Sequence, residues 1–156
     1  MFIAKNNDLI ILAKDTREEL EQALKFMVYT SIEETDIEYE LYNGEYLTPA
    51  EIAVKERQRL DSLTLTPADV ERALYKAKGM DFEDLKALIV QALPSVDIKA
   101  LSIEFRAKDF YRGAEAGGMR LFDVVGALLN ITSEQLDKFF ETKDYHYLMD
   151  EVNNDL

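Results

Sequence analysis

Few residues of this 156-residue chain belong to the types that usually carry catalysis. The chain has no cysteine, which excludes thiol nucleophiles, disulfide bridges and thiolate metal sites. It has a single histidine, His146, whereas nucleophilic catalysis usually needs a histidine base and a metal site needs several convergent ligands. We interpret His146 as a surface or interface residue. The sequence therefore predicts no catalytic residue, metal ligand or cofactor, and the protein is expected not to be an enzyme.

The glycine-rich stretch RGAEAGGMR, residues 112–120, could instead bind an anion. Arginines flank it, and it precedes a predicted helix whose N-terminus could hold an anion. No Gly-Lys-Ser/Thr follows, however, and Glu115 interrupts the stretch. We favour a structural interpretation in which Gly113 ends one helix while Gly117 and Gly118 allow a sharp turn into the next. Whether the loop Gly113–Gly118 also binds an anion remains open at this point.

Acidic residues form the other candidate site. Between Lys25 and Lys55 the chain has seven acids and no base. Asp36, Glu38 and Glu40 alternate, so on a strand their carboxylates would share one face at a spacing of ~6.8 Å. This spacing resembles that of successive phosphates and is compatible with a nucleic-acid mimic that inhibits a host DNA- or RNA-binding defence protein. The alternative, which we favour, is a charged edge strand that prevents aggregation.

The net charge of −13, from 31 acids and 18 bases, narrows the choice of partners. Such an excess opposes direct binding to nucleic acid or to an anionic membrane. A basic protein is a more compatible partner. No apolar run approaches the ~18 residues that span a bilayer, and the N-terminus lacks the pattern of a signal peptide. Apolar residues make up 47% of the chain, which is enough for a sizeable core.

The first third is predicted to be α+β. Apolar segments at 2–4 and 9–13 flank a polar turn, which indicates a hairpin. A helix capped by Asp15 or Thr16 follows, and its apolar stripe comprises Leu20, Ala23, Leu24, Met27 and Val28. Period-two alternation then predicts a strand over 37–42, and Asn43-Gly44 is the strongest short signal for a hairpin turn.

Two similar segments, LTPAE at 47–51 and LTPAD at 65–69, both predict helix starts. In each, a threonine can cap the helix and a proline occupies the first turn, where its missing N–H does no harm. An acid three residues after the threonine can accept a hydrogen bond from the backbone N–H of the cap residue, and its negative charge is stabilised by the helix dipole. A duplicated recognition motif is the alternative, but the surrounding residues show no wider repeat.

The remainder is predicted to be helical. One helix ends at Gly79, a second runs from Asp81 to Pro94, and a third begins near Ser95 or Asp97 and carries Phe105 and Phe110 towards Gly113. The helix over 121–129 is the most apolar and should be the central buried helix, with only a narrow strip left by Asp123, Gly126 and Ala127, where Gly126 would allow a close approach. Thr132 begins the next, and a final turn should dock Tyr145, Tyr147, Leu148 and Val152. We therefore predict an α+β fold in which a hairpin–helix–hairpin head with a linking helix (1–62) precedes a compact helical bundle (63–156).

The helical part resembles a family of small acidic proteins encoded in phages and prophages, often beside tail genes. The resemblance covers roughly residues 60–145, and three segments carry it: LDSLTLTPADVERALYKA at 60–77, DFYRG at 109–113 and DVVGALLNITSEQLDKFF at 123–140. That family has no assigned activity, so no functional residue can be carried over. The resemblance implies a viral accessory or structural role in the cytoplasm of a bacterial host or on the virion.

These observations predict a non-enzymatic, tail-associated or accessory phage protein that binds a protein partner, either a phage structural protein or a basic host protein. Aromatic residues and arginine are enriched in binding hot spots, so Phe110, Tyr111 and Arg112 are the predicted contact residues. The two aromatics could equally belong to the core. The alternative function remains the acidic mimic, with Asp36, Glu38 and Glu40 as its binding face.

Overall fold

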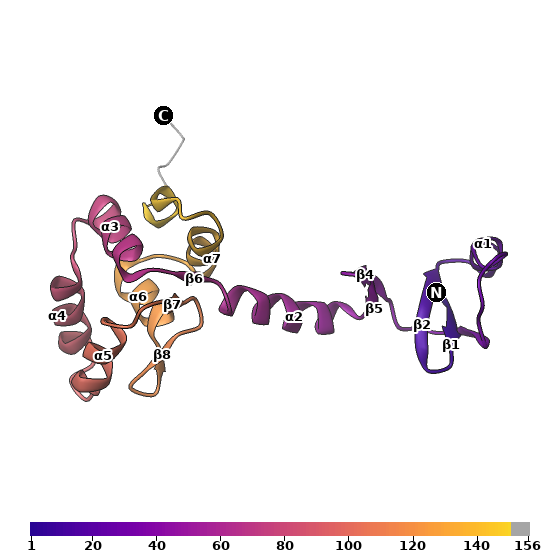
Figure 1. The fold of residues 1–156 in the computed structure, drawn as a ribbon, viewed down its shortest axis with the longest axis horizontal. Helices are drawn as coiled ribbons and strands as arrows, with labels where there is room; N and C mark the ends of the chain where they lie inside the picture. Colours follow the sequence, from indigo (N-terminus) through magenta and orange to yellow (C-terminus); the bar gives the residue numbers. More distant parts are fainter. Residues whose placement is uncertain (151–156) are drawn as a thin grey trace. The chain divides into compact units, whose positions relative to one another are not determined.

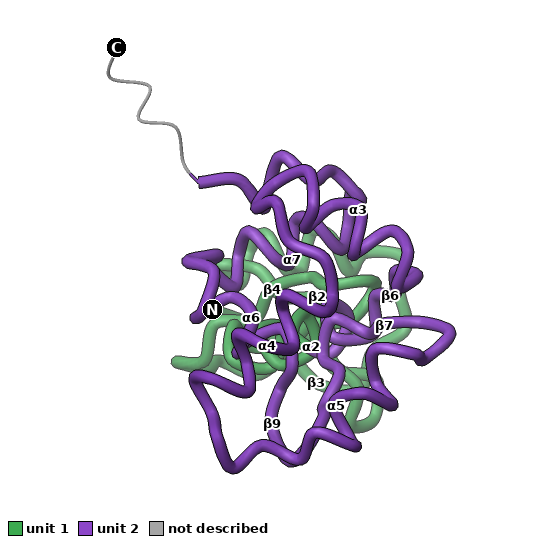
Figure 2. Tube along the Cα trace, turned by 90° about the vertical axis from the view of Figure 1, so that its left-hand side faces the viewer, with its two compact units in different colours: residues 1–57 green, residues 58–156 purple. Residues whose placement is uncertain are grey.

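The computed structural model describes residues 1–150 of the chain. It divides into two compact units, Met1–Arg57 and Gln58–Leu156 (Figure 2). The mixed α+β class predicted from the sequence is confirmed, because small antiparallel sheets with one helix precede a mostly helical region. Within residues 1–150, no helix combines the length and the apolar character needed to cross a lipid bilayer.

A three-stranded antiparallel sheet forms the base of the N-terminal unit. Its strands β1 (Phe2–Asn6), β2 (Leu9–Lys14) and β3 (Ser31–Glu34) are arranged in the order β2-β1-β3. The predicted β1–β2 hairpin is confirmed, and Asn7 takes the left-handed conformation that its turn requires (φ 56°). The strand β3 was not predicted, because its pairing with β1 joins residues that lie far apart in the sequence.

The helix α1 (Arg17–Ala23) covers this sheet with a small core. Thr16 caps it by accepting a hydrogen bond from the Glu19 N–H at 3.2 Å. The buried residues of this core are Ala4, Leu20 and Leu24. The prediction that the apolar stripe continues through Met27 and Val28 is wrong. The helix ends at Ala23, since the chain must turn back to reach β3, and both side chains are exposed.

The predicted hairpin at Asn43-Gly44 is confirmed, but its first strand is shorter than expected. The strands β4 (Glu40–Tyr42) and β5 (Glu45–Leu47) are joined by the two residues at φ 49° and 85°. Asp36 and Glu38 precede β4. The ladder cannot extend beyond the pair Glu40–Leu47, because the helix α2 (Pro49–Asp61) begins two residues after β5.

Both Thr-Pro segments begin helices, as predicted. At α2 the Glu51 carboxylate accepts from the Thr48 N–H at 2.8 Å, and the Glu51 N–H donates to the Thr48 hydroxyl at 3.3 Å. At α3 (Pro67–Lys78) the Thr66 hydroxyl accepts from the Asp69 N–H at 3.2 Å. These short-range contacts explain why the two segments share a sequence without sharing a wider repeat.

The C-terminal unit contains five α-helices among its described residues (Figure 1). After α3 these are α4 (Phe82–Ala92), α5 (Ile98–Glu104), α6 (Leu121–Leu129) and α7 (Ser133–Thr142). The predicted last turn is the 3-10 helix η1 (Tyr145–Leu148), which buries Leu148, whereas the predicted contact of Val152 lies outside the described residues. Gly79, Asp81 and Thr132 take their predicted capping positions.

Two short antiparallel strand pairs, one between distant segments and one a hairpin, interrupt the helices. The strands β6 (Thr64–Leu65) and β7 (Phe110–Tyr111) pair with each other, and β8 (Glu115–Ala116) pairs with β9 (Met119–Arg120). The prediction that the third helix continues to Gly113 is therefore wrong: α5 ends at Glu104, and Phe110 lies opposite Leu65 in a strand. The chain leaves the helix because Phe110 and Tyr111 pair with the distant segment Thr64–Leu65, and helical periodicity cannot reveal such a pairing.

Phenylalanine side chains connect the helices in the core of the C-terminal unit. Phe122 of α6 is central, with ring centroids 5.7 Å from Phe110 and 5.0 Å from Phe140 of α7. The face of α6 that carries Leu121, Phe122, Val125 and Gly126 is buried. Of the predicted narrow strip, Asp123 and Ala127 are exposed, whereas Gly126 is buried, as its predicted close approach to a neighbouring segment requires. Gly126 is required, since a Cβ there would lie 2.6 Å from the Ile131 carbonyl oxygen.

Truncating Phe122 to alanine should lower the free energy of unfolding by about 3–5 kcal/mol, because it empties a buried aromatic site. Urea unfolding of the whole chain, followed by far-UV circular dichroism, measures this change. The control is Glu134→Ala on the exposed first turn of α7, which should cost at most about 1 kcal/mol. Equal midpoints for the parent and Phe122→Ala would contradict the central position of Phe122.

Candidate functional site

The structure separates the three predicted contact residues. The side chain of Tyr111 is 52% exposed, whereas Phe110 and Arg112 are only 0% and 1% exposed. Phe110 belongs to the aromatic core, as the alternative interpretation proposed. The predicted contact surface of Phe110, Tyr111 and Arg112 is therefore wrong for its two buried members, and Tyr111 alone is accessible to a partner.

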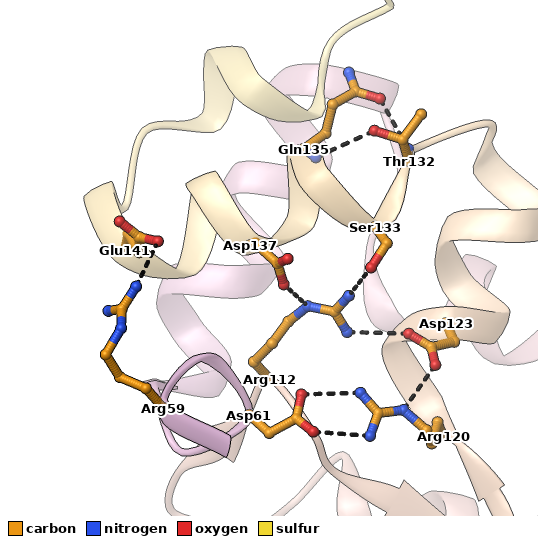
Figure 3. A network of polar contacts seen from close by, with 10 residues as sticks. All are labelled: Arg59, Asp61, Arg112, Arg120, Asp123, Thr132, Ser133, Gln135, Asp137 and Glu141. Carbon is orange, nitrogen blue, oxygen red and sulfur yellow. Dashed lines mark hydrogen bonds and ion pairs between the residues drawn. The ribbon is translucent and has the colours of Figure 1, made fainter. Parts of the chain in front are cut away.

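Arg112 instead holds a buried polar network together (Figure 3). Its Nε donates to Asp137 Oδ1 at 2.9 Å, its Nη1 to Asp123 Oδ1 at 3.1 Å and its Nη2 to Ser133 Oγ at 2.9 Å. Asp123 belongs to α6, while Ser133 and Asp137 belong to α7. Burial of a charged group is costly unless it is paired and hydrogen-bonded, so these contacts are what allow the guanidinium to lie inside the unit.

A second arginine extends the network to the end of α2. Arg120 donates from Nη1 and Nη2 to the two carboxylate oxygens of Asp61 at 3.0 and 2.9 Å, and from Nε to Asp123 Oδ2 at 2.7 Å. The hydrogen bonds to Asp61 and Asp123 raise the pKa of Arg120 above its ordinary value. For Asp123, partial burial alone would raise the pKa, but hydrogen bonds from Arg120 and Arg112 outweigh it and lower the pKa.

The network explains the glycine-rich stretch. Gly117 and Gly118 make the turn between β8 and β9 at φ 60° and 79°, as predicted. The prediction that Gly113 ends a helix is wrong. Gly113 follows β7 and lies against the end of α2, where a Cβ would be 2.8 Å from the Asp61 Cβ. Both flanking arginines donate to carboxylates, so their donors are directed into the protein.

Sequence reasoning missed the acidic partners of these arginines. Asp61, Asp123 and Asp137 look like ordinary solvated residues on amphipathic helices. The three-residue spacing of Arg120 and Asp123 on one helical turn was the only local signal, and it is common on helix surfaces. The remaining pairs join residues between 11 and 59 positions apart, so they could be found only from the fold.

The acidic face is exposed but less regular than predicted. Asp36, Glu38 and Glu40 all lie on the surface. Only Glu40 belongs to a strand, so the even spacing expected along one strand does not apply to Asp36 and Glu38. The three carboxylates form no ion pair with another residue among 1–150. They remain accessible to a basic partner, although not as a regular row.

His146 lies in a local surface cluster. Its Nδ1 is 2.6 Å from Asp144 Oδ1, and its ring stacks on Tyr145 with centroids 4.1 Å apart. Hydrogen bonds from the His146 backbone and then from its side chain lower the pKa of Asp144. No group of three or more histidine, aspartate or glutamate residues suited to holding a metal ion occurs within residues 1–150.

The most unusual surface feature is a loop that sequence reasoning assigned to a helix. Phe26, Met27, Val28 and Tyr29 lie between α1 and β3, and their exposed fractions are 97%, 45%, 79% and 44%. We call these residues the apolar loop. The sequence contained one indication of this loop, an unbroken run of four apolar residues. However, Met27 and Val28 continue the three- and four-residue spacing of the preceding helical stripe, and this spacing predicted that the helix continues.

Hydrogen bonds hold both ends of the apolar loop. At its beginning, the Met27 N–H donates to the Leu24 carbonyl at 2.9 Å. At its end, the Thr30 N–H donates to the Lys5 carbonyl at 2.7 Å, and the Thr30 hydroxyl accepts from the Asn7 N–H at 2.9 Å. The loop is therefore fixed to the β1–β2 hairpin while its side chains point into solvent.

Other apolar surface lies in the same unit. Leu9 is 67% exposed and begins β2, directly after the β1–β2 turn. Thr30, at the end of the apolar loop, is bonded to Asn7 in the same turn. A hollow of about 550 Å³ is lined by residues 8–11 of that hairpin and residues 44–47 of the next. The N-terminal unit thus presents a protruding apolar loop together with a partly apolar hollow, which are features typical of a protein-binding surface.

Comparisons with models of protein families, with curated proteins and with solved structures gave no match. The resemblance of residues 60–145 to phage-encoded acidic proteins therefore stays a prediction.

Replacing Arg112 by leucine should destabilise the protein by about 2–4 kcal/mol, because Asp137 and Ser133 lose their hydrogen bonds to the guanidinium, while Asp123 keeps its pair with Arg120. The free energy of unfolding in urea measures the effect. Arg106→Leu is the control, since Arg106 is exposed and bonds only to the Ser102 carbonyl among the contacts described; it should change stability by no more than about 0.5 kcal/mol. Similar losses in both variants would contradict the structural role of Arg112.

The lowered pKa of Asp123 predicts a contribution to acid sensitivity. Because the folded-state pKa lies below the unfolded value, the stabilisation is complete above the unfolded pKa and disappears as the pH falls through the folded pKa. Asp123→Asn should therefore make the thermal midpoint fall less steeply than in the parent between about pH 6 and about pH 2.5. An equally steep fall in the variant would show that Asp123 does not contribute.

Proposed function

We propose that this protein is not an enzyme and acts by binding another protein, with the apolar loop Phe26–Tyr29 as its principal contact. The observation that carries the proposal is the exposure of four consecutive apolar side chains on a loop fixed at both ends. Large aromatic and aliphatic side chains in this situation are the usual anchors of protein interfaces. The surrounding fold buries Leu20 and Leu24 but leaves this loop uncovered.

Two energetic factors favour binding by this loop: the burial of its apolar side chains and the small loss of backbone entropy. Burial of a phenylalanine or valine side chain contributes roughly 1.5–3 kcal/mol, so a partner that covers Phe26 and Val28 gains a substantial part of its affinity there. The hydrogen bonds at Met27 and Thr30 hold the loop before binding. Less backbone entropy is therefore lost when the complex forms.

The negative charge around the apolar loop indicates what kind of surface the partner has. Residues 26–54 contain seven acids and no base, so the apolar loop begins an extended acidic segment. A complementary surface would combine an apolar socket with lysine or arginine at its rim, because opposite potentials steer association and exclude wrong partners. The phage resemblance supports a tail structural protein or a basic host protein as that partner.

A second candidate function is retained because of one observation: the carboxylates of Asp36, Glu38 and Glu40 are exposed and have no ion-pair partner among residues 1–150. They could occupy the nucleic-acid groove of a host defence protein. Binding would then be dominated by charge and would weaken steeply as salt rises. Binding by the apolar loop should depend much less on salt, so the two functions are experimentally distinct.

The double variant Phe26→Ser/Val28→Ser should lower affinity for the partner by about thirtyfold or more, which corresponds to losing one hot-spot contact. The affinity is measured after capture of the partner from phage-infected cells and its identification by mass spectrometry. Stability should change by no more than about 0.5 kcal/mol per substitution, because both side chains are exposed. Ile103→Ser, at a 63% exposed position on α5, is the matched control and should bind normally.

A triple variant, Asp36→Asn/Glu38→Gln/Glu40→Gln, separates the two functions. If this variant loses binding while the loop variant retains it, the nucleic-acid mimic replaces the apolar-loop proposal. If the loop variant binds its partner as tightly as the parent does, the apolar loop is not the contact, whatever the triple variant does.

A further inference from the structure

A small basic hollow on the C-terminal unit is not used by the function proposed above. Its volume is about 190 Å³, and it lies between α3, along Asp69 to Lys76, and the segment that follows α7. The residues that line it are Asp69, Arg72, Ala73, Lys76, Lys143 and Tyr145. Three of these six are cations, although the chain as a whole carries a net charge of −13. Such a concentration of bases is unexpected on an acidic protein.

The cations of this hollow are incompletely neutralised. Arg72 forms an ion pair with Asp69 at 3.3 Å, and the Lys76 ammonium lies 5.2 Å from the centre of the Tyr145 ring. Neither Lys76 nor Lys143 forms an ion pair with a carboxylate of residues 1–150. The lining therefore carries two more positive charges than negative ones, from three cations and one anion. An anion placed between them would relieve their mutual repulsion.

The backbone at Lys143 places this lysine at the end of α7. Lys143 follows α7 in the left-handed conformation, at φ 61°. The other non-glycine residues with positive φ among residues 1–150 are Asn7, Asn43 and Asn130. Asparagine tolerates this conformation, whereas for most side chains it costs ~1–2 kcal/mol. The helix dipole favours a base near this end of α7 but does not require one at the strained position. A left-handed residue is an ordinary end for a helix, and here the Lys143 N–H donates to the Phe139 carbonyl at 2.7 Å, which fixes the backbone of Lys143 at the edge of the hollow.

We propose that this hollow binds a small molecule that carries a phosphate group. Arg72, Lys76 and Lys143 would donate to the phosphate oxygens, because charge-assisted hydrogen bonds from guanidinium and ammonium groups are the usual means of phosphate recognition. Tyr145 forms one wall, and the volume accommodates a phosphate with a short organic substituent. The site belongs to the C-terminal unit and does not depend on the function of the apolar loop.

Nuclear magnetic resonance of the full ¹⁵N-labelled chain tests the proposal. Inorganic phosphate and glycerol 3-phosphate are titrated separately at constant ionic strength, with sodium chloride as the balancing salt, because screening alone would otherwise shift the signals of exposed charges. We expect saturable shifts of the Lys76, Lys143 and Tyr145 amides with both probes. Shifts that grow linearly without saturation, or equal shifts with chloride, would overturn the proposal.

Substitutions give the second part of the test. Lys76→Gln and Lys143→Gly should each weaken phosphate binding by about tenfold or more, which is the effect of losing one charge-assisted hydrogen bond. Lys143→Gly should also raise the thermal midpoint, since glycine adopts the left-handed conformation without strain, so weaker binding cannot be ascribed to unfolding. Lys99→Gln, which removes an exposed lysine of α5, should leave the affinity unchanged. Unchanged affinity in the Lys76 and Lys143 variants, or an equal loss with Lys99→Gln, would exclude the site.

Discussion

The C-terminal unit depends on one constraint, the buried positive charge of Arg112. Its guanidinium can remain inside only while Asp123, Ser133 and Asp137 accept its hydrogen bonds, and these residues come from two different helices. Its backbone N–H donates to the Leu63 carbonyl at 2.9 Å, which adds the chain after α2 to the same arrangement. The relative positions of α6, α7 and the β6–β7 pair are thus fixed by polar contacts as well as by the aromatic core.

The two units use similar residue types in different ways. In the C-terminal unit, phenylalanine and arginine side chains near position 110 serve the fold, and so they are not available for binding. The N-terminal unit is smaller and buries only Ala4, Leu20 and Leu24 in its own cluster. So small a core leaves the Phe26–Tyr29 loop outside it. We therefore propose protein binding by the N-terminal unit, and phosphate binding at the hollow of the C-terminal unit in which Lys76 and Lys143 form no ion pair within residues 1–150.

Prediction from the sequence succeeded where the contacts are local. Four capping positions were predicted correctly, because each cap bonds to a backbone group three residues away; they are Thr48, Thr66, Asp81 and Thr132. The Asn43-Gly44 turn was predicted for the same reason. For the first helix the prediction allowed Asp15 or Thr16, and the structure has Thr16. Of the candidate site, the sequence predicted the exposure of the acidic residues, left Tyr111 open between contact and core, and predicted neither the burial of Arg112 nor the apolar loop.

By itself, then, the sequence determined the charge, the α+β class, the absence of cysteine chemistry and most helix starts. Tertiary structure alone decided which apolar and charged side chains face solvent. Phe110 and Phe26 both lie in short segments that follow a helix, yet one is 0% and the other 97% exposed. The difference arises because Phe110 pairs with Leu65, 45 positions earlier, whereas Phe26 lies in the loop that returns the chain to β1. Burial depends on such distant pairings, and local periodicity contains no information about them.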